Sequence, residues 1–358
     1  MANQIEKSNL ELINEFLKDP ERKSLIKISY ELIVLLFAYR EIPIHYFSRF
    51  VFKKKTKNFK DFVPNRFAGK ISVLINDHSI KDVLDNKLFF DFFYGRFEIT
   101  LPKLIMYNNK NMFIHENNAV EVNNDHDFAI LLEDVFKNSP SLDSLIIKKT
   151  SASSSGKKIF KLFRDELRSN PGILKGIYSE VIKSGFLFQE TIKQHPELDR
   201  LNPSCLNTIR IDTFINPDGK VEIASAYLRM SISNSHIDNI SSGGCQVGIE
   251  LETGKLKKYG YALIKTMGVK ILTEHPITKT IFEDFTIPYF REVRELVIKT
   301  APLIPGLRLI GWDVAVGESG PVLIEGNSDY DLSGNDLADG GYMANKIFRK
   351  VLKEINFL

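Results

Sequence analysis

The spacing of apolar residues differs between three parts of the chain, and each spacing predicts a different kind of element. Over residues 3–40 they recur every three or four positions, which predicts two helices. Over residues 66–149 short apolar runs alternate with helical patterns. We expect strands there at 71–77, 104–109, 112–117 and 145–149, and helices at 79–94 and 127–136. A later run predicts a strand at 186–192, and the three runs after it predict an antiparallel meander at 208–215, 221–230 and 245–251. The chain as a whole therefore predicts an α/β fold.

Residues 309–327 carry the strongest chemical signal. Two apolar runs flank the turn residues 317–320, which predicts a hairpin. Asp313 lies in the first run, and Glu325 and Asn327 lie in the second. Because strands alternate faces, all three can lie on one face of the pair. Buried carboxylates need a cation, and an oxygen-only ligand set suits Mg²⁺, whose remaining ligands are then often substrate phosphates. A hairpin whose polar residues face water is the alternative, and the largely apolar neighbours disfavour it.

The segment 150–158 is a small, hydroxyl-rich loop between the strand at 145–149 and a predicted helix at 159–167. Small side chains let backbone N–H groups approach a phosphate closely, and the neighbouring lysines add positive charge. The spacing is not that of a Walker A loop. Taken alone, the loop is weak evidence for phosphate binding, because a single Ser-rich turn is more often a flexible polar loop.

Arg210 and Arg229 lie within otherwise apolar strands, where a guanidinium group needs an anionic partner. Asp212 or Glu222 is one choice for that partner. A bound phosphate is the other, and it gains weight if the neighbouring segments hold a nucleotide.

Residues 42–62 mix aromatic side chains with six Lys and Arg residues. Such a mixture can lie on an anionic membrane surface or contact a glycan or nucleic acid. A helical cap with packed aromatics and solvated lysines is the simpler interpretation, and we favour it.

Composition limits the function classes. With 358 residues, 43% hydrophobic and 26% charged, the chain is an ordinary globular protein. A net charge of +3 gives no argument for nucleic-acid binding. Two cysteines, Cys205 and Cys245, lack metal-ligand spacing and predict a reducing, cytoplasmic setting. The longest apolar run, 32–39, is much shorter than the ~20 residues of a spanning helix, so we expect no membrane crossing.

Several phrases, taken in their order along the chain, together resemble the ATP-grasp superfamily, and within it the sugar-transfer-associated group found among bacterial surface-polysaccharide genes. They are Asn207-Thr208-Ile209-Arg210, Asp238-Asn239 with Gly243-Gly244, His275-Pro276, Gly311-Trp312-Asp313 and Glu325-Gly326-Asn327. The resemblance runs from about residue 72 to the C-terminus. It implies an ATP-grasp fold with an N-terminal helical extension, and ATP and Mg²⁺ as cofactors. The implied parts are a helical segment (1–64), a small α/β domain (65–140), a lid (141–195) and a C-terminal antiparallel subdomain (196–358).

The resemblance also implies roles for individual residues. The nucleotide-binding positions it indicates are Lys87, Lys148, Ser153, Ser154, Ser155, Gly156, Gln189, Glu190, Ile192 and Glu197. Lys149 is an alternative to Lys148, and His195 or Asp199 is an alternative to Glu197 at the ribose. The positions that resemble phosphoryl or substrate clamps are Arg229, Asn239 and Arg210, and those that match metal ligands are Asp313, Glu325 and Asn327.

The chemistry that the resemblance implies is activation of a carboxylate by ATP and capture of the acylphosphate by an amine. We expect a small-molecule acid and amine, or a glycan intermediate, as substrates, in a nucleotide cleft between the lid and the C-terminal sheet. No nucleic-acid partner is expected, and peripheral contact with membrane or glycan machinery through residues 42–62 stays open. Two alternatives remain: a small-molecule kinase on the same fold, and a non-catalytic nucleotide- or glycan-binding module.

Overall fold

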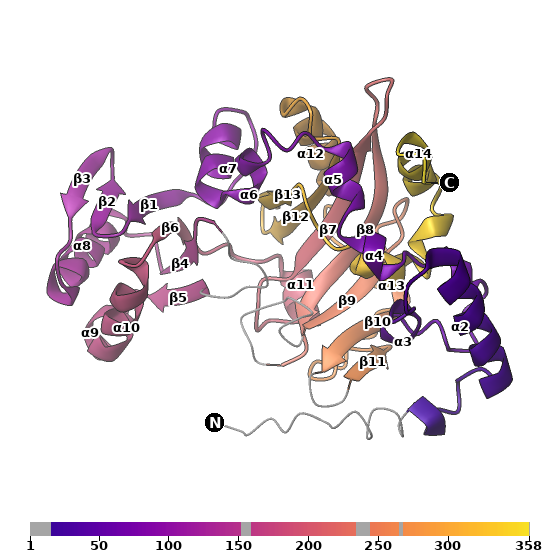
Figure 1. Ribbon diagram of the computed structural model, residues 1–358. Coiled ribbons are helices and arrows are strands. Elements are labelled where there is room, and N and C mark those ends of the chain that lie inside the picture. Colours follow the sequence, from indigo (N-terminus) through magenta and orange to yellow (C-terminus); the bar gives the residue numbers. More distant parts are fainter. Residues whose placement is uncertain (1–15, 152–158, 234–243, 265–267, 358) are drawn as a thin grey trace. The chain divides into compact units, whose positions relative to one another are not determined.

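The computed structural model describes residues 16–151, 159–233, 244–264 and 268–357. The chain divides into two compact units (Figure 1). Unit 1 comprises residues 1–81, 194–321 and 326–358, and unit 2 comprises residues 82–193 and 322–325. The predicted four-part division stays a prediction, but one sheet of unit 2 takes strands from both the predicted small domain and the predicted lid.

Unit 2 is built on a six-stranded sheet in the order β3-β2-β1-β6-β4-β5, and every pair of neighbours is antiparallel. Its strands are β1 (Leu104–Asn109), β2 (Met112–His115), β3 (Asn118–Glu121), β4 (Ser144–Lys149), β5 (Ile159–Phe163) and β6 (Gly185–Glu190). Its helices are α6 (Asp82–Asp85), α7 (Lys87–Tyr94), α8 (Asp125–Asn138), α9 (Glu166–Ser169) and α10 (Pro171–Val181).

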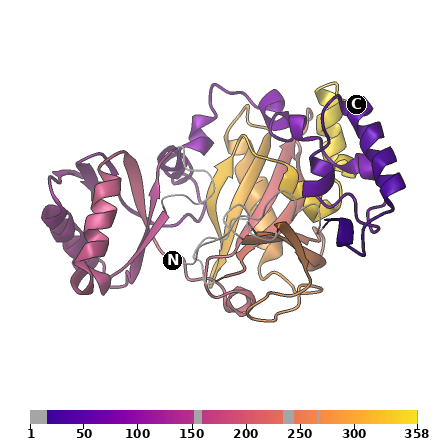
Figure 2. The ribbon, with the colours of Figure 1, turned by 60° about the horizontal axis from the view of Figure 1, so that its bottom comes forward.

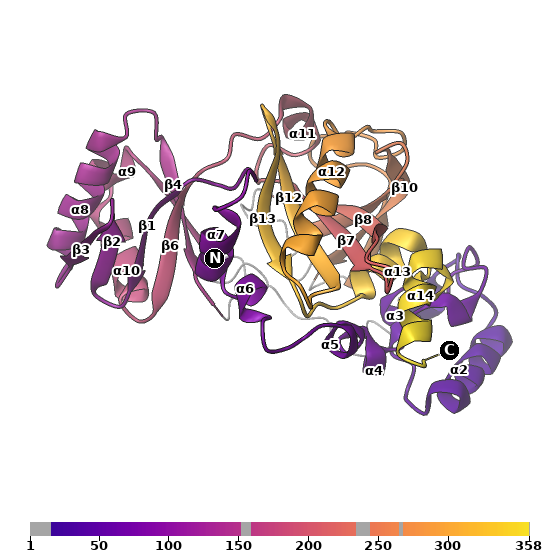
Figure 3. The same cartoon turned by 90° about the horizontal axis from the view of Figure 1, so that it is seen from above.

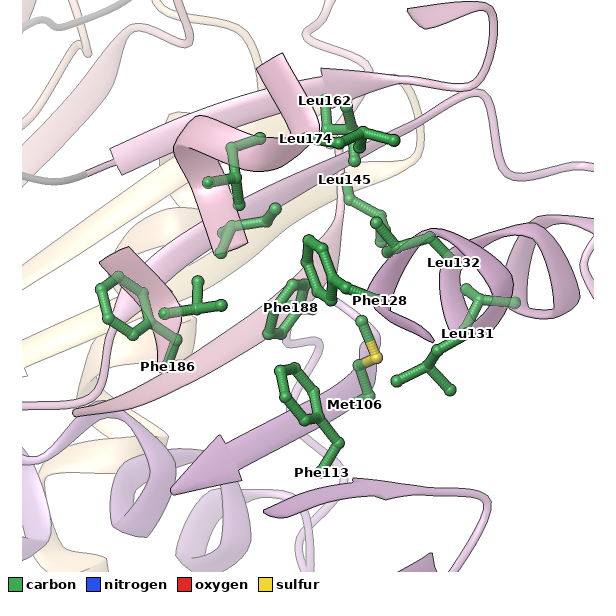
Figure 4. Packing of buried hydrophobic residues seen from close by; sticks show 14 of the residues in the cluster. Met106, Phe113, Phe128, Leu131, Leu132, Leu145, Leu162, Leu174, Phe186 and Phe188 are labelled. Atoms are coloured by element: carbon green, nitrogen blue, oxygen red, sulfur yellow. The ribbon is translucent and has the colours of Figure 1, made fainter. Parts of the chain in front are cut away.

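The core of unit 2 lies between the sheet and helices α8 and α10, as Figure 4 shows. Phe188 of β6 packs among Phe113 of β2 and Phe128 of α8, with ring centroids 6.0 and 6.3 Å away. Strand alternation then places the neighbouring residues Leu187 and Gln189 on the opposite face of the sheet. That opposite face carries the polar groups described below.

Two predictions in this region are wrong. Residues 159–163 form strand β5 and not a helix, because they pair with β4 across the serine-rich loop. A short apolar run does not distinguish helix from strand, and here pairing decides. The helix predicted over 79–94 is two helices, α6 and α7, because the Asn86 side chain accepts hydrogen bonds from the Leu88 and Phe89 amides and starts α7 anew.

Unit 1 contains a seven-stranded sheet in the order β11-β10-β9-β8-β7-β12-β13 (Figure 2). The strands are β7 (Thr208–Ile215), β8 (Val221–Ser231), β9 (Gly244–Ile249), β10 (Leu256–Ile264), β11 (Gly268–Leu272), β12 (Leu309–Gly317) and β13 (Gly320–Asn327). The final residues of β13 before Gly326 cluster with unit 2. The predicted antiparallel order of β7, β8 and β9 and the predicted hairpin are confirmed.

Helices α12 (Phe290–Thr300), α13 (Ser333–Asp339) and α14 (Lys346–Glu354) pack on this sheet, and α11 (Pro196–Leu201) precedes β7 (Figure 3). Phe214 of β7 packs with Phe348 of α14, and Asp212 of β7 accepts a hydrogen bond from Asn335 of α13. Because Arg210, Asp212 and Phe214 alternate with apolar residues, α13 and α14 cover the face of β7 that carries its charged residues.

The strand predicted at 71–77 is also wrong, because this segment forms helix α5 (Ile71–Ile75) after α4 (Asn65–Ala68). Ile71 is buried against the cluster around α14. Asn76 ends the helix and donates from its amide nitrogen to the carbonyls of Leu309 and Ser328, 2.8 Å each. The Asn76 side chain therefore links this helical segment to the first residue of β12 and to the residue after β13.

The N-terminal part of unit 1 is helical, as predicted, with α2 (Leu25–Tyr39), α3 (His45–Ser48) and a 3₁₀ turn at Phe59–Asp61. Tyr46, Phe50, Phe52 and Phe62 are buried in one cluster with the inner face of α2. The favoured interpretation of residues 42–62, a cap with packed aromatics, is confirmed for these four. No helix in the described part of the chain is long and apolar enough to cross a membrane.

Candidate active site

Asp313 is the acidic residue of β12, and its carboxylate binds two arginine side chains. Strand register places Asp313 opposite Arg210 on β7, and Thr208 of β7 opposite Arg229 on β8. Asp313 Oδ1 accepts from Arg210 Nε at 2.5 Å, and Oδ2 accepts from a terminal nitrogen of Arg210 at 3.1 Å. The same Oδ2 pairs with Arg229 at 2.7 Å, and Thr208 Oγ1 accepts from Arg229 at 2.8 and 3.1 Å. One buried anion therefore joins two guanidinium groups.

These pairs differ from the partners considered from sequence. Glu222 forms an ion pair with Lys350 at 2.6 Å and not with either arginine. Burial alone would lower the pKa of Arg210, but the charge and hydrogen bonds of Asp313, together with Tyr227 and Asp212, raise that pKa above its usual value. Arg210 is therefore a permanent cation whose fork geometry fits a carboxylate or a phosphate.

Glu325 and Asn327 lie on β13, the strand next to β12. Glu325 Oε2 pairs with Lys87 Nζ at 2.8 Å, both groups being partly exposed. Asn327 donates from its amide nitrogen to the Gly311 carbonyl at 3.3 Å, so its amide oxygen is the atom suited to bind a cation. A carboxylate and an amide two residues apart on one strand lie on the same face.

The donor set of these three residues fits Mg²⁺ in kind, because all of its ligand atoms are oxygens. Each carboxylate, however, already has a cationic side chain beside it, two arginines at Asp313 and Lys87 at Glu325. Among the described residues no group of three or more Asp, Glu, His and Cys side chains forms a candidate metal site. A bound ion would therefore take the place of at least one of these ion pairs.

Unit 2 places two predicted nucleotide residues beside a carboxylate that the sequence analysis missed. Lys148 is buried on β4. Burial raises the pKa of Asp91 on α7, and the hydrogen bond from Gln189 and the charge of Lys148 only partly oppose that rise. Gln189 on β6 donates from Nε2 to Asp91 Oδ2 at 3.0 Å. Lys149, the alternative to Lys148, is only half-buried. Asp91 follows Lys87 by four residues on α7, and this helical spacing is the signal that could have identified it.

The start of α7 is tied to the end of β4. The Lys87 amide donates to the Thr150 carbonyl at 2.7 Å, so the helix that carries the first predicted nucleotide lysine begins directly beside the strand that carries the second. The position of Lys87 is therefore fixed by backbone as well as by its side-chain ion pair.

The remaining predicted nucleotide positions lie at the end of β6 or after it. The Glu190 amide donates to the Lys103 carbonyl at 3.0 Å, and Ile192 is half-buried beyond the strand end. Glu197 of α11 is exposed and pairs with Arg200 at 2.7 Å. Of its two alternatives, His195 caps α11 by accepting from the Glu197 amide, and Asp199 accepts from Gln194 Nε2 at 2.9 Å. These contacts leave the ribose assignment a prediction.

Five predicted positions lie outside the described residues. Four are in the serine-rich loop, and the fifth is on the segment between β8 and β9: Ser153, Ser154, Ser155, Gly156 and Asn239. Their roles stay predictions from the resemblance.

A polar cluster lies beside Arg210. The sequence analysis named only one of its members, Asp212, as a possible partner of that arginine. Asp212 is fully buried, and its Oδ2 accepts from Asn335 Nδ2 of α13 at 2.6 Å. Burial raises the pKa of Asp212 to about 7, although the charge of Arg210 acts to lower it. Gly334 allows α13 to lie this close, because a Cβ there would be 2.4 Å from the Tyr227 hydroxyl. Asp212 follows Arg210 by two residues, which places both on one face.

Solved structures resemble this chain at low identity. D-cycloserine synthetase DcsG aligns at 11% identity over 82% of each chain, with a TM-score of 0.46. D-alanine–D-alanine ligase from Bacillus anthracis aligns at 12% identity over 76% of this chain and 68% of its own, with a TM-score of 0.42. N5-carboxyaminoimidazole ribonucleotide synthetase from Thermotoga maritima aligns at 10% over 76% and 49%, with a TM-score of 0.39. No curated protein sequence matches.

The family comparison covers much more of the sequence than the motifs named above. A model described as "Sugar-transfer associated ATP-grasp" matches residues 66–352, which include both described sheets and every residue discussed as a candidate ligand. The arginine-held Asp313 and the two lysines near β4 lie within this match. The chain belongs to the sugar-transfer associated ATP-grasp family.

Proposed function

We propose that the protein is an ATP-dependent carboxylate–amine ligase that works through an acylphosphate. The observation that carries the proposal is that two carboxylates on the neighbouring strands β12 and β13 are each paired with cationic side chains. Asp313 is held by Arg210 and Arg229, and Glu325 is paired with Lys87. Such a set can exchange its internal ion pairs for a metal ion and phosphates without leaving an unpaired buried charge.

The proposal gives each of these side chains a role. Lys87 and Lys148 would neutralise charge on the triphosphate, and Gln189 would meet the adenine edge. Asp313, Glu325 and Asn327 would hold Mg²⁺, which would supply charge neutralisation at the phosphates. Arg210 and Arg229 are permanent cations beside that position, suited to the charge that spreads over the transferring phosphoryl group.

The reaction balances without a covalent enzyme intermediate. A substrate carboxylate oxygen attacks the γ-phosphorus, the bond to the β-phosphate oxygen breaks, and ADP leaves. An amine then attacks the acyl carbon, phosphate leaves, and the amine loses a proton as the amide forms. The chain needs only to bind, orient and neutralise charge in this sequence.

The substrate class is the finer part of the proposal, and the family's description as associated with sugar transfer supports it. We infer a sugar acid, or a sugar intermediate that bears an amino acid, during synthesis of a surface glycan. Arg210 and the buried polar residues of β7 and α13 offer the cation and hydrogen-bonding groups that such a carboxylate requires.

Hydroxylamine trapping tests the reaction class. Purified protein with ATP and Mg²⁺ is incubated with single uronic acids and amino acids, and hydroxamate, ADP and phosphate are measured. We expect ADP, free phosphate and a hydroxamate with the correct acid. A stable phosphorylated product with no hydroxamate would identify a kinase, and nucleotide binding without any turnover across the panel would identify a non-catalytic module. Either result would refute the ligase.

A further inference from the structure

Helix α2 carries apolar residues on two sides. Its inner side, with Ile28 and Leu35, is buried in the cluster that contains Phe50 and Phe52. Its outer side carries a second apolar stripe at helical spacing, formed by Ile26 (85% exposed), Tyr30 (63%), Ile33 (54%) and Phe37 (78%). A surface helix normally turns one apolar stripe to the core and a polar face to water. Within the described chain, this outer stripe is not covered.

The outer stripe is part of a larger apolar patch. Leu25 and Leu36 flank it on α2, and Ile42 and Ile44 follow on the turn after the helix, all four exposed. Single exposed apolar residues need no explanation, but a contiguous group of this size marks an interaction surface. Figure 3 shows α2 at the outer margin of unit 1, beside α3.

The inner contacts fix the orientation of the helix. Glu31 is buried and pairs with Lys23 at 2.7 Å, and the Tyr46 hydroxyl donates to the same carboxylate at 2.6 Å. Rotating α2 to bury the outer stripe would break this buried network, which is costly. The stripe is therefore a fixed feature of the surface.

The charge around the patch is positive. Residues 16–62 contain eleven Lys and Arg against five Asp and Glu, whereas the whole chain carries a net charge of only +3. Lys27 is exposed on α2, and Arg40 is exposed directly after it. Lys54 is exposed too, and its ammonium group donates to the Pro20 carbonyl just before the helix. An apolar helix face with basic flanks is typical of helices that lie in the plane of an anionic membrane surface.

We propose that the outer stripe of α2 binds an anionic lipid surface. Ile26, Ile33 and Phe37 enter the boundary between head groups and acyl chains, Tyr30 lies at the head-group level, and Lys27 and Arg40 face the lipid phosphates. The inference goes beyond the proposed ligase activity and does not depend on it. It also centres the lipid-binding surface on α2, with Ile42 and Ile44 beside it, because the principal aromatics of residues 42–62 are buried.

Vesicle flotation tests this inference with the full-length protein. Vesicles of phosphatidylglycerol and phosphatidylethanolamine are compared with vesicles of phosphatidylcholine alone. We expect the protein to float with the anionic vesicles, to bind neutral ones weakly, and to lose affinity as salt rises, because the basic flanks are exposed and screened.

Matched variants locate the binding surface. Ile33→Glu combined with Phe37→Glu should lower the partition coefficient at least about tenfold, since both side chains enter the apolar boundary. Ile281→Glu is the control, because Ile281 is 63% exposed elsewhere on unit 1. It should float like the unmodified protein. All variants should show unchanged circular dichroism and thermal unfolding, because the substituted side chains are exposed.

Three results would overturn the proposal. The first is no flotation of the unmodified protein with anionic vesicles, and the second is equal flotation of the double variant. The third is a dimer in light scattering that the double variant converts to a monomer while neither protein floats. That result would assign the stripe to a second copy of the chain.

Discussion

Replacing Asp313 by Asn tests whether this carboxylate holds the sheet together as well as serving as a proposed metal ligand. The side chain is 1% exposed and accepts from Arg210 at 2.5 and 3.1 Å and from Arg229 at 2.7 Å. Asparagine keeps the shape but removes the charge, and its amide nitrogen would face other donors. Two guanidinium groups on β7 and β8 then lose their shared anion.

The burial of these side chains sets the expected loss of unfolding free energy. Neutralising one partner of a buried ion pair costs about 3–5 kcal/mol of unfolding free energy. The Arg229 side chain is 14% exposed and can partly rehydrate, so we expect a value near the lower end, about 3 kcal/mol. Glu325→Gln removes a pair whose two side chains are 17% and 23% exposed, which should cost about 1 kcal/mol or less.

Urea unfolding without nucleotide measures both variants. The double variant Asp313→Asn/Arg210→Met adds a second test, because it removes one of the two guanidinium groups that share the Asp313 carboxylate. It should recover part of the stability lost in Asp313→Asn, which gives a coupling energy of about 1–3 kcal/mol in a double-mutant cycle.

Two outcomes would refute this reasoning. Asp313→Asn could prove no less stable than Glu325→Gln, or the double variant could prove no more stable than Asp313→Asn. In either case the two arginines do not depend on Asp313 for their counter-charge in the folded protein.

Three further predictions concern activity, packing and pH. Glu325→Gln should fold and lose turnover by about two orders of magnitude, whereas Glu318→Gln, at the exposed hairpin tip, should leave the rate of ADP formation unchanged. Gly334→Ala should lower the unfolding free energy by about 1–3 kcal/mol in thermal melts, because its Cβ meets the Tyr227 hydroxyl. Burial raises the pKa of Asp212 from 3.8 to about 7, so the folded state binds its proton more tightly and stability falls as pH rises from about 4 to about 7. Asp212→Asn should lack that contribution, and the stability difference between the two proteins should change over this window by at most about 1.4 kcal/mol per pH unit and level off above it.

The sequence predicts those parts of the structure that short-range patterns determine. The hairpin of β12 and β13 is confirmed. It could be predicted because alternation of apolar residues and a glycine-flanked turn are both local signals. Residues 159–163 and 71–75 were assigned wrongly because each is a short apolar run whose state depends on distant neighbours. The first is a strand only because β4 offers it an edge, and the second is a helix packed beneath α14.

The candidate site likewise combines residues that the local sequence marks with contacts that depend on distant parts of the chain. Residue type marked Asp313, Arg210 and Arg229 as candidates, but their mutual contact depends on the register of β7, β8 and β12. Arg210 and Asp313 are 103 residues apart in sequence, and a shift of one residue in that pairing would turn them to opposite faces. Asp91 was missed because one acid on a helix four residues after a lysine is common on solvated surfaces.

The contacts of the candidate ligands have a consequence for the proposed order of binding. The cations assigned to the phosphates and the carboxylates assigned to the metal are partners of one another, Lys87 with Glu325 and the two arginines with Asp313. A metal ion that arrives alone would have to compete with these cationic side chains for the carboxylate oxygens. A metal ion that arrives with the triphosphate would bring phosphate oxygens, which can accept hydrogen bonds from those side chains while the ion binds the carboxylates. In the proposed reaction we therefore expect the nucleotide and the metal to bind together.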